Sequence, residues 1–113
     1  MYTELKIGND SYKLRLSTKR AVDLEKALGF NPLQIFFNIN NGELPKLADM
    51  MTMLQYFLLD LQHGLKMDDV YEIYDKFVAE GHNLFDLIPI FIEVLKESGF
   101  MVEDSEEVES KNA

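Results

Sequence analysis

Two carboxylates and two histidines are the side chains of this sequence most able to support acid–base or metal chemistry. Asp86 and Glu93 lie seven residues apart in a mostly apolar stretch, which puts them on one helix face about 10 Å apart. That separation is long for a cooperating acid–base pair. His63 and His82 each adjoin a helix-ending glycine, where a histidine more often meets the last carbonyl groups than a metal. We therefore expect no catalytic residues and no enzymatic activity.

The residue types and spacings of this sequence exclude other common metal-binding and phosphate-binding motifs. The chain has no cysteine, which excludes disulfides, thiolate metal sites and cysteine nucleophiles. If Gly42 is placed at the loop glycine of an EF-hand, Phe37 and Ile39 fall where oxygen ligands belong, which excludes calcium there. The six glycines are scattered singly and form no phosphate-binding loop. We expect no metal and no cofactor.

The formal net charge of −9 is unevenly distributed along the chain. Residues 1–26 carry six basic and four acidic residues, whereas the remainder carries five basic and sixteen acidic ones. The basic cluster of Lys13, Arg15, Lys19 and Arg20 is interpreted as a solvated face. The acidic remainder would repel nucleic acid and anionic membrane, so we expect neither as a partner. The longest uncharged apolar stretch, residues 50–59, is too short to span a bilayer.

Alternation of apolar and polar residues on both sides of a Gly-Asn-Asp turn predicts a β-hairpin over residues 2–16. Apolar stripes at helical spacing then predict five helices, over residues 18–28, 32–40, 45–63, 68–80 and 84–98. The expected fold class is α+β and mainly helical, with residues 1–102 as a single globular domain. Residues 103–113 contain five acids and too little apolar surface to order, so a flexible acidic tail is expected.

Several helix ends can be predicted from capping chemistry. Ser17 or Thr18 can cap the first helix. Asn83, with Asp86 three residues on, resembles a capping box in which aspartate replaces the usual glutamate. Pro89 lies deep within the expected last helix, so a kink is expected there.

The expected helix over residues 45–63 is apolar nearly all round and contains a methionine cluster. Methionine fills irregular cores, but it also suits surfaces that grip varied apolar partners. Core filling is its commoner role. A domain of 113 residues can bury only a limited apolar surface, however, and this chain has two nearly apolar helices and thirteen aromatic residues. Part of that surface is therefore expected to be covered by a partner or a second copy. The candidate partner-binding residues are therefore Met50, Met51, Met53, Leu54, Phe57, Leu58 and Leu61.

The stretch "ELKIGNDSYKLRLSTKRAVDLEKALGFNPLQIFF" resembles the N-terminal pattern of tail assembly chaperones from long-tailed bacteriophages and prophages of Gram-positive hosts. A short hairpin precedes a T-x-x-A-x-x-L-E-x-x-L-G-x-N-P helix and turn. The helical remainder and the acidic C-terminus are similar too, so the resemblance covers most of the chain. The matching motif residues are Thr18, Ala21, Leu24, Glu25, Leu28, Gly29, Asn31 and Pro32.

This resemblance implies a binding protein with no catalytic residues to assign. Such chaperones keep the tape-measure protein soluble and help recruit tail-tube subunits during tail assembly. They act in the host bacterial cytoplasm and are generally absent from the mature virion. The alternative is a small helical adaptor or regulatory protein that homo-oligomerises through its Met-rich apolar helix.

Overall fold

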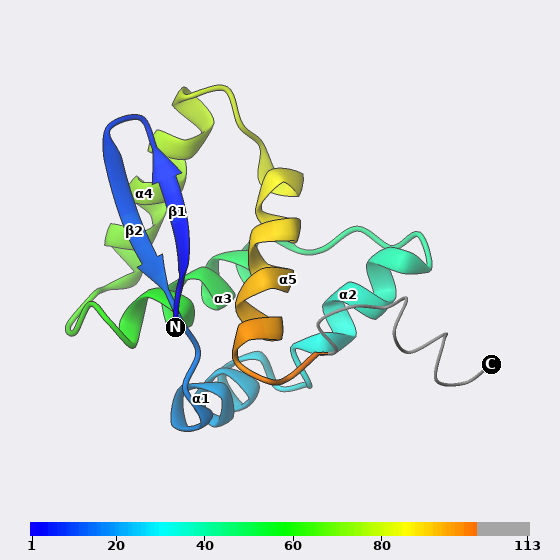
Figure 1. Ribbon diagram of the computed structural model, residues 1–113. Helices are drawn as coiled ribbons and strands as arrows, with labels where there is room; N and C mark the ends of the chain where they lie inside the picture. Colours follow the sequence, from blue (N-terminus) through cyan, green and yellow to red (C-terminus); the bar gives the residue numbers. More distant parts are fainter. Residues whose placement is uncertain (102–113) are drawn as a thin grey trace.

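The computed structural model describes residues 1–101 as a two-stranded antiparallel hairpin followed by five α-helices (Figure 1). This arrangement confirms the expected α+β, mainly helical class. The expected acidic tail, residues 103–113, lies outside the described residues. The elements are β1 (Thr3–Ile7), β2 (Asp10–Leu14), α1 (Thr18–Leu28), α2 (Leu33–Asn40), α3 (Leu47–Leu59), α4 (Met67–Ala79), the 3-10 turn η1 (Leu84–Asp86) and α5 (Leu87–Glu97).

The hairpin has one buried face, as its alternating pattern predicts. Thr3 pairs with Leu14 and Ile7 with Asp10, so the two strands are joined by the residues Gly8 and Asn9. Gly8 has a φ of 59°, a left-handed conformation that tight hairpin turns need and glycine adopts without strain. The apolar face packs on helices, with α5 against β1 and α3 against β2.

Helix α3 lies at the centre of the fold and packs against α1, α4 and β2. Its buried side chains belong to a single apolar core to which both strands and all five helices contribute. Within that core the Phe57 and Phe91 rings meet edge to face, with centroids 5.0 Å apart. No residue among those described is both buried and polar or charged. None of the helices in residues 1–101 combines the length and apolar character needed to cross a membrane.

Helix α3 ends at Leu59, four residues before the expected end at His63. The Phe57 carbonyl accepts the Arg15 N–H at 2.9 Å, while the Leu61 N–H bonds to the Leu58 carbonyl at 3.2 Å. The i to i−4 bond from Leu61 to Phe57 is therefore replaced by a bond from Arg15, the residue that follows β2, although the Gln62 N–H still bonds to the Leu58 carbonyl at 2.9 Å. The apolar run that continues to Leu61 gave no sign of this.

The expectation that Pro89 lies deep within the last helix, on which the expected kink was based, is wrong. The predicted capping box is present, with the Asn83 N–H donating to Asp86 and the Phe85 N–H donating to Asn83, both at 2.9 Å. It opens η1, so α5 begins only at Leu87. Pro89 is then the third helical residue, in the first turn, where a missing N–H breaks no intrahelical bond.

Truncation of Phe57 tests whether α3 is the centre of the core. We expect Phe57→Ala to lower the free energy of unfolding by about 3–5 kcal/mol, since it removes a fully buried ring and leaves a cavity. The matched control is Phe85→Ala on a side chain that is 51% exposed, with an expected cost below about 1 kcal/mol. Urea denaturation measures both values. Equal costs for the two variants would contradict a core centred on α3.

Candidate partner-binding surface

The methionine-rich helix does not offer the surface expected of it. Six of the seven candidate partner-binding side chains have exposed fractions of 2% or less, and only Leu61, in the turn after α3, is 36% exposed. In the folded chain these six fill the core and are unavailable to a client or to a second copy. The buried six are Met50, Met51, Met53, Leu54, Phe57 and Leu58.

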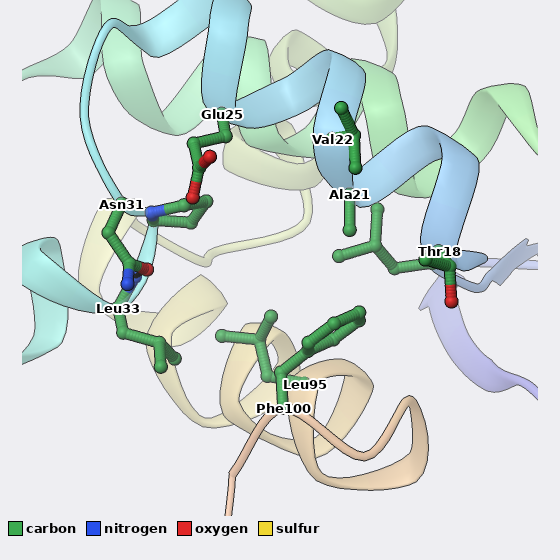
Figure 2. A pocket seen from close by; sticks show the side chains of 10 residues that line it. Thr18, Ala21, Val22, Glu25, Asn31, Leu33, Leu95 and Phe100 are labelled. Atoms are coloured by element: carbon green, nitrogen blue, oxygen red, sulfur yellow. Dashed lines mark hydrogen bonds between the residues drawn. The ribbon is translucent and has the colours of Figure 1, made fainter.

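A largely apolar cavity lies elsewhere, between α1, the start of α2 and the end of α5 (Figure 2). Its volume is about 190 Å³, and it is open to solvent. Figure 2 shows Ala21 and Val22 on one wall, with Leu95 and Phe100 opposite. The lining residues are Leu16, Thr18, Ala21, Val22, Glu25, Asn31, Pro32, Leu33, Leu95 and Phe100.

The turn between α1 and α2 places residues of both helices around this cavity. Ser17 caps α1, and Gly29 ends it with a φ of 83°. The chain then restarts at once, because Asn31 Oδ1 accepts the Leu33 N–H at 2.9 Å and Pro32 has a helical φ of −53°. This stop and restart separates α1 from α2, and residues of both helices and of the turn between them line the cavity.

Five of the eight residues that match the tail-chaperone motif line this cavity: Thr18, Ala21, Glu25, Asn31 and Pro32. Sequence reasoning interpreted them as caps, stripe positions and stops. The available signal was their spacing, since positions 18, 21, 22 and 25 share one helix face. That face forms one wall of the cavity, whereas the fully buried Leu24 lies on the face of α1 that packs in the core.

Asp60 fixes the start of α1 against the end of α3. Its carboxylate accepts hydrogen bonds from Arg15 Nε and, at 2.9 Å, from Ser17 Oγ, and Arg20 Nε lies 4.0 Å away. Burial acts to raise the pKa of Asp60, but the hydrogen bonds from Arg15 and Ser17 and the charges of Arg15 and Arg20 outweigh it and lower the pKa. Part of the basic cluster expected in water therefore holds the cavity wall in place.

The chemistry that this cavity offers is binding. Its walls are aliphatic and aromatic, and Thr18, Glu25 and Asn31 provide polar groups at its edge. An apolar cavity of about 150 Å³ accepts a benzene ring, so this one can take a large branched or aromatic side chain. Within residues 1–101 no group of three or more histidine, aspartate or glutamate side chains is arranged to hold a metal ion.

Residues 2–112 match a family of unknown function, DUF6096. The chain belongs to this family. No curated protein and no solved structure matches it.

In this DUF6096 chain the two carboxylates considered for acid–base chemistry have ordinary surroundings. Asp86 serves the capping box and lies 3.5 Å from His82 Nδ1, and Glu93 is exposed on α5. His82 stacks on Phe77, with ring centroids 4.5 Å apart. The structure therefore does not bring Asp86 and Glu93 together as a pair.

Replacement of Asp60 tests the link between α1 and α3. We expect Asp60→Asn to lower the free energy of unfolding by about 1–3 kcal/mol at pH 7, because hydrogen bonds to a charged acceptor are weakened. Because folding lowers the pKa of Asp60, its contribution is complete above the ordinary carboxyl value of about 3.9 and is lost as pH falls through the folded value. The difference between wild type and variant should therefore shrink on acidification.

The measurement is chemical denaturation between pH 7 and pH 2.5. Asp75→Asn, on the exposed face of α4, serves as the control and should remain close to wild type throughout. A difference for Asp60→Asn that stays constant down to pH 2.5 would exclude the carboxylate charge as its cause.

Proposed function

We propose that this protein is a phage tail assembly chaperone that binds the tape-measure protein, keeps it soluble and helps recruit tail-tube subunits. The observation that carries the proposal is the convergence of five motif residues on one open apolar cavity. Residues that served folding alone would be expected to pack against other side chains and fill this space. Residues that bind a client must instead leave space for it. The proposed place of action is the host bacterial cytoplasm, with no part in the mature virion.

A tape-measure protein is a long helical chain with apolar patterning, and the cavity suits one anchor side chain of such a helix. An amphipathic helix presents a large apolar residue on every turn or two of one face, and a groove binds it through such anchors. Burial of one leucine or phenylalanine contributes about 1.5–3 kcal/mol. That is modest for one contact, so a long client would be held by several chaperone copies along its length.

The acidic exterior supports the second part of the role. A formal net charge of −9 on each bound copy gives a loaded complex a strong like charge, which opposes aggregation of an apolar client. The same charge opposes binding to nucleic acid or anionic membrane. No catalytic step, metal or cofactor is required.

The test is co-expression with the tape-measure protein encoded beside the chaperone gene, comparing wild type with Ala21→Leu. Ala21 points into the cavity, so the added carbon atoms fill the space that the client anchor would occupy (Figure 2). We expect wild type to increase the recovery of soluble tape-measure protein and Ala21→Leu to weaken binding at least tenfold, or about 1.4 kcal/mol.

The matched control is Ala27→Leu, the same change at an exposed position of α1, which should behave as wild type. Thermal unfolding of both variants separates lost binding from lost folding. If wild type leaves the solubility of the tape-measure protein unchanged, the proposed function is wrong. If Ala21→Leu binds as wild type does, the cavity is not the client site.

A further inference from the structure

The longest segment without a charged residue spans residues 27–42, which include the whole of α2. Charged residues make up 27% of the chain, yet none occurs between Lys26 and Glu43. Loss of charge together with aromatic enrichment is the compositional signal that distinguishes the centre of a protein–protein interface from ordinary surface. Here the signal falls on a helix at the edge of the molecule (Figure 1).

One face of α2 is anchored in the core and the other projects into solvent. Ile35 and Phe36 are buried, with exposed fractions of 5% and 6%, while the next side chain, Phe37, is 62% exposed. On the projecting face Gln34 and Asn38 bond to each other, Nε2 to Oδ1, at 2.9 Å. Phe37 therefore forms an apolar projection on an uncharged, amide-bearing face.

A hollow of about 270 Å³ lies beside this projection, between α2 and the start of α3. Gln34 and Asn38 form one wall, and Phe30 and Leu44 contribute exposed apolar surface, at 36% and 78%. This hollow is separate from the cavity between α1 and α5, and Phe37 lies on the face between the two. The α2 face thus carries both a projecting ring and a space large enough to accept one.

Electrostatics favours a second copy of this chain as the occupant. Two molecules of formal net charge −9 repel each other over most of their surfaces, so close contact costs least where charge is absent. A basic partner would gain nothing from an uncharged face and would be drawn to the acids elsewhere. A projection beside a hollow is also what a two-fold contact requires, because each copy must present both halves.

We propose that the α2 face, comprising Phe30, Gln34, Phe37, Asn38 and Leu44, forms an isologous homodimer. Phe37 of each copy enters the hollow of the other across the two-fold axis. Three charged residues also line the hollow, Glu43, Lys46 and Asp49, and the lysine of each copy can pair with an acid of the other across the axis. This interface is independent of the client cavity, so dimerisation and client binding can be lost separately.

The test is sedimentation equilibrium of the full chain from about 1 μM to 1 mM. Wild type should shift from the 13.1 kDa monomer to twice that mass as concentration rises. Added salt should strengthen the dimer on balance, because it screens the repulsion between two molecules of net charge −9, whereas few charged residues lie at the contact itself. Phe37→Lys should raise the dissociation constant about a hundredfold, since two buried rings are lost at once.

The matched control is Phe85→Lys, at an aromatic residue that is 51% exposed outside the α2 face, and its dissociation constant should equal that of wild type. Ala21→Leu should also remain dimeric, which separates this interface from the client cavity. Circular dichroism confirms folding of each variant. A wild type that stays monomeric at 1 mM, or an unchanged dimer of Phe37→Lys, would overturn the proposal.

Discussion

The rest of the structure depends on covering α3 on nearly every side. A helix that is apolar almost all round is stable in water only when other elements bury it. In this chain β2, α1 and α4 pack directly on α3, and Phe91 of α5 meets Phe57 across the core. The same constraint explains why only five of the thirteen aromatic residues are strongly exposed. The fold itself buries most of the apolar side chains of α3, so the high apolar content of the chain does not require a partner at this helix.

The positions of α1 and α2 follow from how that covering is fixed in place. The Arg15 N–H bonds to the Phe57 carbonyl, and Asp60 joins Arg15 and Ser17, so the last turn of α3 determines where α1 begins. Helix α2 is less constrained, because only Ile35 and Phe36 are deeply buried. The cavity and the α2 face both lie in this less constrained region. A fold with most of its apolar area committed to the core can place interaction surfaces there without losing its central packing.

The sequence predicted the kind and order of the elements because local rules determine them. The hairpin pattern, the Ser17 cap, the stop at Gly29 and the Asn83 capping box involve residues only a few positions apart. The errors came from contacts between distant residues or from exact helix starts. At the end of α3 the Phe57 carbonyl bonds to the distant Arg15, and the late start of α5 places Pro89 in its first turn, where no intrahelical bond is lost. The candidate surface was misplaced for a related reason, since an all-apolar pattern cannot indicate whether a helix is buried or partner-bound.

The claim that most needs a direct test is that clients bind the cavity between α1 and α5 and leave α3 in the core. Methyl-labelled protein titrated with tape-measure segments reports both sites in one experiment by nuclear magnetic resonance. We predict shifts for the methyl groups of Ala21, Val22, Leu33 and Leu95, with the methyl signals of Met50, Met51 and Met53 nearly unchanged. Large shifts of these methionine methyl signals, with unchanged methyl signals from the cavity residues, would contradict the claim and indicate that clients bind α3.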